Sequence, residues 1–475
     1  MKNVKNIKMN LSDEVRKYEF LKTASEVAEQ LEVDTYIVGG FIRDILLRRK
    51  RDDIDFLVVG DGPKYASSLA NAFGIKDIVI FKNFGTAHFR YHDINFEFVG
   101  ARKESYNKAS RKPDVAAGSF KDDISRRDFT INTLAVSINK KNFGELIDTF
   151  NGLADLENKI IKTPLDPLIT FDDDPLRIMR AFRFASQLGF MVDDKVIKAA
   201  GKLRERLEIV SQERITDEFI KILGSPKPSV GLELLFNSGV MDVVFPEIAK
   251  ISGVEQRKDY HHKDVFLHTC KVVDNTAEKS ENVWLRFAAL VHDIAKPQTK
   301  KFVEGIGWTF HGHDEIGARM MKLIFRRMKL PMNKLEYIEK MIRLHLRPIA
   351  LVSEEVTDSA VRRLIVSAGD ELEELITLCR ADITSKNPAK VSKYLSNYDR
   401  VMKKVLMVQE KDELRAFQSP VKGETIMEVC KLKPSKKVGE IKQAIEDAIL
   451  DGKIGNNYEE AYQYLLKIKD DFLNN

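Results

Sequence analysis

Short runs of β-branched and aromatic residues mark the segment from Thr35 to Asp148. Runs of this kind, bounded by glycine, asparagine and aspartate, predict β-strands. Helical stretches over residues 41–47 and 63–73 lie between them, and the polar segment 103–118 predicts a mobile loop. The pattern therefore predicts a mixed domain of helices and strands, with strands over residues 35–38, 54–59, 78–81, 87–91 and 94–99.

The pattern changes after Asp148, where strand-like runs almost disappear. Hydrophobic residues recur from there to the C-terminus at spacings of three and four, which is the period of an amphipathic helix. Breaks rich in glycine, proline and polar residues divide this part of the chain. We therefore expect several helical modules, separated near residues 224–228, 252–260, 385–390 and 418–423.

Composition narrows the class of protein. Of the 475 residues, 43% are hydrophobic and 31% are charged, so the chain is globular rather than disordered or collagen-like. Three widely spaced cysteines form neither a disulfide framework nor a cysteine zinc site, which favours the cytoplasm. No apolar run approaches the roughly 18–20 residues that span a bilayer. The net charge of +5 permits a polyanionic partner without requiring one.

Two glycines follow the first predicted strand. Gly39 and Gly40 precede a helix, so backbone N–H groups and the helix dipole would cradle a phosphate there. On the next strand, Asp53 and Asp55 are two residues apart and project from one face. Glu97 can add a third carboxylate from a neighbouring strand. Such a pair alone is more often a solvated strand end, but beside the glycines it predicts catalytic carboxylates that bind Mg²⁺ and a nucleoside triphosphate.

These residues open a series of motifs that resembles the class II tRNA nucleotidyltransferase family, which includes CCA-adding enzymes and bacterial poly(A) polymerases. The resemblance implies an α+β fold, with a polymerase-β-like nucleotidyltransferase head followed by an all-helical neck, body, HD domain and tail. The motifs occur in order at residues 37–44 (IVGGFIRD), 53–55 (DID), 126–135 (RRDFTINTLA), 148–156 (DTFNGLADL), 173–180 (DDPLRIMR) and 213–218 (ERITDE).

The resemblance and the breaks together predict five domains. They are a head (1–150), a neck that carries the base template (151–225), a helical connection or body (226–255), an HD domain (256–390) and a C-terminal body or tail that binds RNA (391–475).

The resemblance also assigns roles to residues of the head. Gly40 and Arg43 would hold the triphosphate, and the paired aspartates would hold the Mg²⁺ ions. Arg127 would reach the nucleotide phosphates, and Asp128 the ribose 2′-hydroxyl. Without the other motifs, this last segment would be read as a charged loop before a helix.

In the neck, Asp174, Arg177 and Arg180 are spaced three apart, so they are neighbours along a helix surface. The resemblance implies that the first two form a protein template for the incoming base and that Arg183 also belongs to the nucleotide site. A carboxylate accepts from the amino group of C or A, and an arginine donates to the adjacent ring nitrogen. The alternative is a surface ion pair. Asp173 stands where the family usually has glutamate.

Seven of the nine histidines fall between residues 261 and 345. The segment 287–296 (FAALVHDIAK) resembles the HD phosphohydrolase signature, and imidazole and carboxylate ligands suit Mn²⁺, Fe²⁺, Ni²⁺ or Zn²⁺. We interpret His88, His92, His261 and His262 as ordinary structural residues. The resemblance implies a first metal site at His268, His292, Asp293 and Asp382, and a second that uses His313 and His345.

The implied function is a CCA tRNA nucleotidyltransferase that uses CTP and ATP, with an HD-type phosphohydrolase able to trim damaged tRNA ends. Its partner would be the tRNA 3′ end. The basic segment 48–51 (RRKR) lies beside the predicted active site, and the basic segment 431–442 (KLKPSKKVGEIK) would contact the tRNA elbow or T-arm. We expect no membrane and no obligate protein partner.

Three alternatives stay open. A poly(A) polymerase is disfavoured because residues 82–91 lack a GRR- or GRK-type basic strand. Enzymes that add only CC or only A differ in loops that one sequence does not interpret. A phosphohydrolase with an RNA-binding head is disfavoured by the intact aspartate pair.

Overall fold

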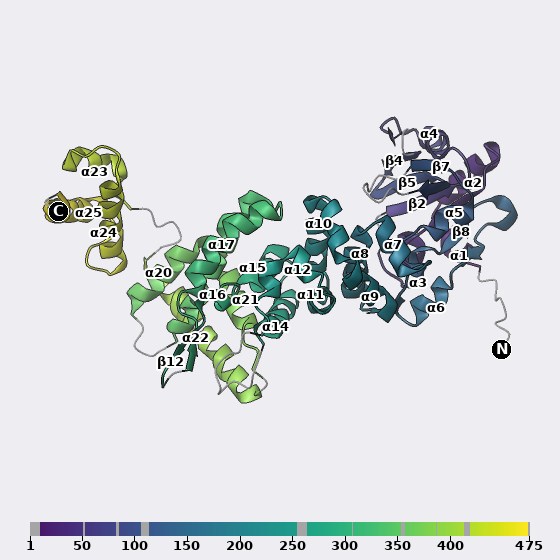
Figure 1. Cartoon of the computed structure of the whole chain (residues 1–475). Helices are drawn as coiled ribbons and strands as arrows, with labels where there is room; N and C mark the ends of the chain where they lie inside the picture. The colour runs from purple at the N-terminus through teal and green to yellow at the C-terminus, as the bar shows by residue number, and fades with distance from the viewer. Residues whose placement is uncertain are drawn as a thin grey trace. The chain divides into compact units, whose positions relative to one another are not determined.

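The computed structural model describes residues 10–50, 53–81, 85–105, 114–253, 264–305, 307–352, 357–385, 387–412 and 419–473. It divides into two compact units, Met1–Ala249 and Lys250–Asn475, and each is described by itself. Figure 1 labels their helices and strands. Of the helices in the described ranges, none is long and apolar enough to cross a membrane.

A seven-stranded mixed sheet forms the centre of the first unit (Figure 1). Strand β2 pairs in parallel with β5 and antiparallel with β1. The five strands predicted from the sequence are confirmed to within about a residue at each end, whereas β8 and β9 were not predicted. In spatial order the strands are β3 (Val79–Phe81), β4 (Thr86–Tyr91), β5 (Ile94–Gly100), β2 (Asp53–Val58), β1 (Thr35–Val38), β8 (Ala135–Ser137) and β9 (Leu146–Ile147).

One face of this sheet carries an aromatic core. Phe56 of β2 stacks on Phe98 of β5 at a centroid distance of 4.9 Å, and Tyr65 of α4 (Gly62–Ala72) packs against both rings. Side chains alternate along a strand. The burial of Phe56 therefore turns Asp53 and Asp55 toward the opposite face, which leaves them available for chemistry.

The expectation of a loop over residues 103–118 is wrong at both ends. Strand β6 (Arg102–Ser105) pairs antiparallel with β7 (Asp114–Ala117). The sequence of β6, RKES, has no β-branched or aromatic residue, so only the pairing with its partner strand stabilises it as a strand. Residues 106–113 lie outside the described residues.

Helices follow the sheet and complete the first unit. Helix α8 packs between α10 and α11, and a short parallel pair joins β10 (Ile160–Ile161) to β11 (Met191–Val192). The helices of this unit besides α4 are α1 (Ser12–Val15), α2 (Phe20–Gln30), α3 (Gly40–Leu46), α5 (Phe120–Ser125), α6 (Gly152–Glu157), α7 (Pro167–Asp173), α8 (Leu176–Leu188), α9 (Asp194–Lys202), α10 (Gln212–Leu223), α11 (Pro228–Asn237), α12 (Met241–Val244) and α13 (Pro246–Ala249).

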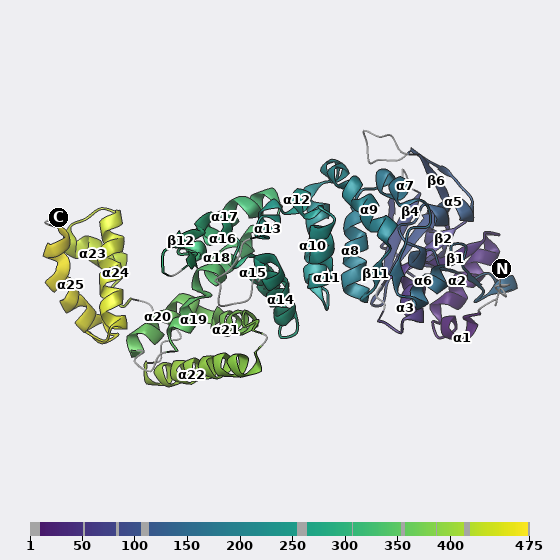
Figure 2. The same cartoon turned by 60° about the horizontal axis from the view of Figure 1, so that its bottom comes forward.

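In the described residues of the second unit, the regular structure is helical apart from the hairpin of β12 (Lys301–Val303) and β13 (Gly307–Thr309). Helix α15 packs against α14, α18 and α21, and α17 packs against α18 (Figure 2). The helices are α14 (Val265–Ala277), α15 (Val283–Val291), α16 (Lys296–Thr299), α17 (His313–Arg327), α18 (Leu335–Leu344), α19 (Arg347–Ala350), α20 (Asp358–Ala368), α21 (Leu372–Ala381), α22 (Pro388–Asp412), α23 (Gly423–Cys430), α24 (Lys436–Leu450) and α25 (Tyr458–Leu473).

The last three helices share a core of their own. Ile426, Ile441, Ile445 and Leu465 are buried where α23, α24 and α25 meet, and these helices are drawn in yellow in Figure 2. The predicted break at 224–228 separates α10 from α11, and that at 385–390 includes the start of α22. Most of the break at 252–260 lies outside the described residues. The five domain limits stay predictions.

Candidate active site and metal centre

The three predicted catalytic carboxylates lie on adjacent strands of the head. Asp55 of β2 is directly opposite Glu97 of β5. Asp53, also on β2, accepts a hydrogen bond of 2.8 Å from Asn95 of β5. The pKa of Asp55 is raised to about 6, mainly by burial and further by the negative charges of Glu97 and Asp53, although Arg127 and Arg180 partly oppose the rise. A cluster of carboxylates with an excess of negative charge fits Mg²⁺, which prefers oxygen ligands.

The glycine turn lies against the same carboxylates. Gly39 has φ 75° and ψ −136°, a conformation that side-chain-bearing residues rarely adopt. A Cβ at this position would lie 3.0 Å from Oδ2 of Asp55 and 3.0 Å from Nη1 of Arg127. Glycine is therefore required for the backbone to approach the carboxylate, and Gly40 begins α3 immediately afterwards.

Arg43, predicted to hold the triphosphate, is buried on the inner side of α3. Its guanidinium donates to both carboxylate oxygens of Asp44, at 2.9 and 2.8 Å, and to the side-chain oxygen of Asn132 at 2.8 Å. It also lies 5.0 Å from the ring of Phe184. These contacts fix the position of α3, and the triphosphate role stays a prediction.

A cleft of about 520 Å³ joins the carboxylates to the predicted template. Among the described residues, its lining includes Asp55 and Glu97 on one side and the neck residues on the other. Five residues assigned to nucleotide binding from the sequence line it, namely Arg127, Asp128, Asp174, Arg177 and Arg180. The lining does not include Asp53, Gly39, Gly40, Arg43 or Arg183.

Asp128 is the most constrained residue of the cleft. Its Oδ1 accepts from the backbone of Phe129 and from Nδ2 of Asn132, and its Oδ2 accepts from Nε and Nη2 of Arg180 at 2.8 and 2.6 Å. Burial alone would raise its pKa, but Arg180 and Asn132 outweigh that effect and lower the pKa to about 2. Four donors occupy the acceptor sites of the carboxylate. Contact with a ribose hydroxyl would therefore require one of them to move.

Helix α8 presents three arginines at intervals of three residues. Arg177 is buried, and it donates to the backbone oxygens of Thr170 and Arg126 at 3.2 and 2.5 Å. These bonds use two of its five N–H groups and leave three for a ligand. Asp174, at the end of α7, lines the same cleft and accepts from the backbone N–H of Leu176 at 3.1 Å.

Arg183 has a different environment from the template arginine. It pairs with the buried carboxylate of Glu218 on α10 at 2.7 Å and lies 4.3 Å from the ring of Phe184. The motif 213–218, to which the sequence alone gave no role, thus ties α10 to α8. Its Arg214 lines the cleft, as do Arg102 and Arg126.

Two aromatic residues of the cleft, His88 and Phe81, were also not assigned to the site from the sequence. His88, interpreted as structural, lines the cleft beside Phe81, and their ring centroids are 5.8 Å apart. The period-two pattern of β4 places His88 on one face of the strand, but the strand pairing with β3 is needed to bring the two rings together.

The predicted basic RNA contacts lie at the surface. Arg49 donates to the backbone oxygen of Gln187 at 3.0 Å, whereas Arg51 lies outside the described residues. Lys436 and Lys442 of α24 form helical ion pairs with Glu440 and Glu446. RNA binding by either segment stays a prediction.

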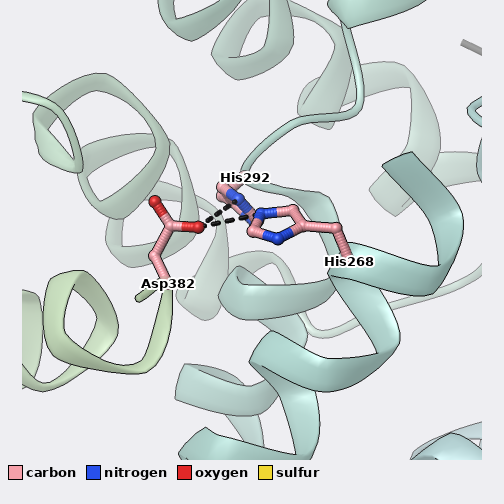
Figure 3. A group of neighbouring side chains, drawn as sticks. All are labelled: His268, His292 and Asp382. Carbon is pink, nitrogen blue, oxygen red and sulfur yellow. Dashed lines mark ion pairs between the residues drawn. The ribbon is translucent and has the colours of Figure 1, made fainter. Parts of the chain in front are cut away.

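In the second unit, the predicted HD ligands form two neighbouring groups. His268, His292 and Asp382 make up the first group, and Asp293, His313 and His345 the second. Oδ1 of Asp382 lies 2.9 Å from Nε2 of His268 and 3.6 Å from Nε2 of His292 (Figure 3). His261 and His262 lie outside the described residues.

Asp293, which the sequence assigned to the first site, belongs by its geometry to the second group and also faces the first. Its Oδ2 is 3.2 Å from Nε2 of His292, and its Oδ1 is 3.4 Å from Nε2 of His313. Lys296 donates to Oδ2 at 2.6 Å. One carboxylate oxygen therefore faces each group, as in a carboxylate that bridges two ions.

Three of the histidine rings are oriented by hydrogen bonds from Nδ1, the ring nitrogen that faces away from the other ligands. Nδ1 of His292, His313 and His345 each lies within 2.8 Å of the backbone oxygen three residues earlier. A carbonyl oxygen only accepts, so Nδ1 carries the proton and Nε2 offers its lone pair to a metal.

Two observations indicate that these residues fit metal ions. Nε2 of His313 and of His345 face each other at 3.4 Å, and two lone pairs at that distance repel unless a cation lies between them. Nε2 of His292 is buried and makes no hydrogen bond within the described structure. The donor set of imidazole and carboxylate suits a divalent transition metal, whose identity is open.

Comparisons with known proteins agree with this arrangement. The chain matches the poly A polymerase head domain at residues 35–162, the "Probable RNA and SrmB- binding site of polymerase A" at 189–251 and the HD domain at 265–386. It is 35% identical over 280 residues to an A-adding tRNA nucleotidyltransferase of Aquifex aeolicus (strain VF5). That match covers 57% of this chain and 32% of the relative, about a third of its length.

Solved structures extend the likeness to nearly the whole chain. A tRNA nucleotidyltransferase complexed with a primer tRNA and an incoming ATP analog has a TM-score of 0.58 and 25% identity, and the alignment covers 80% of this chain and 99% of that one. A CCA-adding enzyme in apo form has a TM-score of 0.64 and 22% identity, with coverage of 97% and 98%, and shows the shared fold. The chain therefore carries, in this order, a poly A polymerase head domain, an RNA-binding region of the same type and an HD domain, as its motifs predicted, and it shares its fold with CCA-adding enzymes.

Proposed function

We propose that this protein adds C, C and A in turn to the 3′ end of tRNA, from CTP and ATP. The observation that carries the proposal is the single cleft that contains both the carboxylates Asp55 and Glu97 and the template residues Asp174 and Arg177. A catalytic group and a base-reading group within one cleft are what a polymerase without a nucleic-acid template requires.

The reaction is a direct phosphoryl transfer. The 3′-oxygen of the RNA bonds to the α-phosphorus of the nucleotide, the bond to the bridging oxygen breaks, and pyrophosphate leaves. Asp53 and Asp55 would hold Mg²⁺, with Glu97 as a third carboxylate, and these ions would supply activation of the attacking hydroxyl and charge neutralisation of the leaving pyrophosphate. Arg127, beside Asp55 and the glycine turn, would bind the phosphates.

Base choice would rest on the edge of the incoming base. Asp174 accepts from the exocyclic amino group of C or A, and Arg177 donates to the unprotonated ring nitrogen beside it. Uracil and guanine present a carbonyl and a protonated nitrogen at these positions, so each leaves a polar group of the cleft unpaired. The two backbone carbonyls that hold Arg177 support this role, because they fix the guanidinium before the base arrives.

Addition of A alone is a second candidate. It is favoured by the name of the relative from Aquifex aeolicus, an A-adding tRNA nucleotidyltransferase. Poly(A) addition remains a further alternative of the same chemistry.

The test is to incubate the full chain with tRNAs that end before the first C, after CC and after CCA, with each nucleoside triphosphate in turn, and to sequence the products. Incorporation of C, C and A on the shortest tRNA supports the proposal. Addition only after CC would establish A-addition, and long A tails would establish a poly(A) polymerase. Asp53→Ala and Asp55→Ala serve as inactive controls that should still bind tRNA. Incorporation by either variant at the wild-type rate would refute the assignment of the carboxylates.

We also propose that the HD domain is a metal-dependent phosphohydrolase that acts on phosphate esters at RNA 3′ ends. The two neighbouring ligand groups, both of which Asp293 faces, support it, since paired sites stabilise the attacking and leaving oxygens of a displacement at phosphorus. Release of inorganic phosphate from 3′-phosphorylated RNA, after loading with Mn²⁺, Fe²⁺, Ni²⁺ or Zn²⁺, tests it. No release with any of these metals would contradict it.

A further inference from the structure

A hairpin with an exposed phenylalanine lies along the chain between Asp293 and His313, two members of the second ligand group of the HD centre. Strands β12 and β13 pair Phe302 opposite Trp308, with ring centroids 5.3 Å apart. The side chain of Phe302 is 66% exposed, and that of Val303 is 38% exposed. Single exposed apolar residues are common, but here an exposed phenylalanine packs on a half-buried tryptophan in the middle of a two-stranded ribbon, which offers an aromatic surface to a ligand.

Both ends of this hairpin are tied to metal ligands. At its start, Lys296 of α16 donates to Oδ2 of Asp293 at 2.6 Å and lies 5.6 Å from the ring of Phe310. At its end, the backbone oxygen of Phe310 accepts from Nδ1 of His313 at 2.7 Å. The five residue-to-residue steps from Trp308 to His313 span at most roughly 17 Å. The aromatic pair is therefore within reach of a few nucleotides of a chain whose end lies at the metal centre.

The charge of the hairpin favours a polyanion. Nζ of Lys300 lies 4.3 Å from the ring of Trp308, and Lys301 is exposed beside it, against one exposed carboxylate, Glu304. Lysines interleaved with aromatic rings bind single-stranded nucleic acid, since the cations attract phosphates and the rings stack on bases.

We propose that this hairpin stacks an unpaired base near the 3′ end of an RNA and so directs the terminal phosphate into the HD metal centre. The proposal rests on the phosphohydrolase function proposed above, and it names the substrate as RNA with an unpaired 3′ end rather than a free mononucleotide. In the step itself, the oxygen of water bonds to phosphorus, the ester bond breaks, and the leaving ribose oxygen takes up a proton.

The first experiment compares substrates that contain the same phosphate ester in different surroundings. Phe302→Ala and Trp308→Ala are measured on an unpaired RNA with a 3′-phosphate, on 3′-AMP and on p-nitrophenyl phosphate, in the metal-loaded full chain. We expect KM for the RNA to rise about five- to a hundredfold, the range for the loss of one stacked base, with kcat for p-nitrophenyl phosphate unchanged. Phe302→Tyr should restore the low KM. Leu323→Ala on α17, 72% exposed in the wild type, is the matched control and should change nothing.

An equal change in KM for all three substrates, or no change for the RNA, would refute the proposal that the hairpin stacks a base. An equal rise for 3′-AMP and the RNA would identify a mononucleotide site instead. A second measurement is independent of hydrolysis: RNA with a photoreactive thiouridine next to its 3′ end is cross-linked, and the modified peptide is identified. Cross-links within residues 300–309 support the proposal even if no phosphate is released, a result that would refute only the phosphohydrolase. Cross-links confined to other parts of the chain would refute the proposal that the hairpin binds the RNA.

Discussion

Arg177→Ala should relax the choice of base more than it slows phosphoryl transfer. In the wild type, the guanidinium is fixed by the backbone oxygens of Thr170 and Arg126, and its remaining N–H groups are available to the cleft. The catalytic carboxylates lie on strands of the sheet, so the substitution leaves them in place. If the proposed roles hold, base reading and chemistry should therefore be separable in this cleft.

The size of the effect follows from the hydrogen bond that is lost. A polar group left unpaired in a buried site typically costs about 1–3 kcal/mol. Arg177 would donate to the ring nitrogen of cytosine, whereas the protonated nitrogen of uracil offers it no acceptor. We expect the ratio of kcat/KM for CTP over UTP to fall by about ten- to a hundredfold. Activity on all nucleotides will also fall somewhat, since two backbone oxygens lose their donor.

Arg206→Ala is the control that separates a general fall in activity on all nucleotides from a specific loss of base reading. Arg206 also bonds to α7, with Nη2 donating to the backbone oxygen of Asp172 at 2.8 Å and Nε pairing with its carboxylate at 3.0 Å, but it does not line the cleft. The assay measures kcat/KM for CTP, ATP, UTP and GTP on one tRNA with the wild type and both variants. If Arg177→Ala lowers all four values by one common factor, as expected of Arg206→Ala, the template role is refuted.

Three further predictions concern other parts of the chain. His292→Ala combined with Asp293→Ala should remove bound transition metal, measured by elemental analysis, without lowering CTP incorporation; a wild type that binds no metal after supplementation would contradict this. Glu218→Ala should lower the free energy of unfolding by about 3–5 kcal/mol, because Arg183 then remains partly buried without its partner; denaturant unfolding with a loss below about 1 kcal/mol would argue against a structural ion pair. Gly39→Ala should reduce kcat/KM for every nucleotide at least tenfold, since φ 75° strains alanine and its Cβ would meet two cleft side chains at 3.0 Å; steady-state kinetics at the wild-type level would show that the turn adapts.

The sequence was most informative where local pattern and burial agree. The strands of the head were predictable because runs such as DIDFLV alternate toward an aromatic core. Strand β6 was not predictable, because its residues have low strand propensity and only the partner strand β7 stabilises it. Residue types at known spacings likewise indicated the HD ligands, whereas the cleft positions of Arg214 and His88 depend on how α10 and β4 pack.

The three arginines of α8 show why spacing alone does not assign roles. Their positions along the helix are equivalent, yet each has a different partner: Arg177 binds backbone carbonyls, Arg180 binds Asp128, and Arg183 binds Glu218. A carboxylate that pairs with an arginine offsets the charge of its guanidinium and restrains its orientation. Carbonyls fix Arg177 without neutralising it. Of the three, Arg177 alone lines the cleft without a close ion pair to a carboxylate among the described residues, and a fixed arginine of this kind is suited to reading the edge of a base.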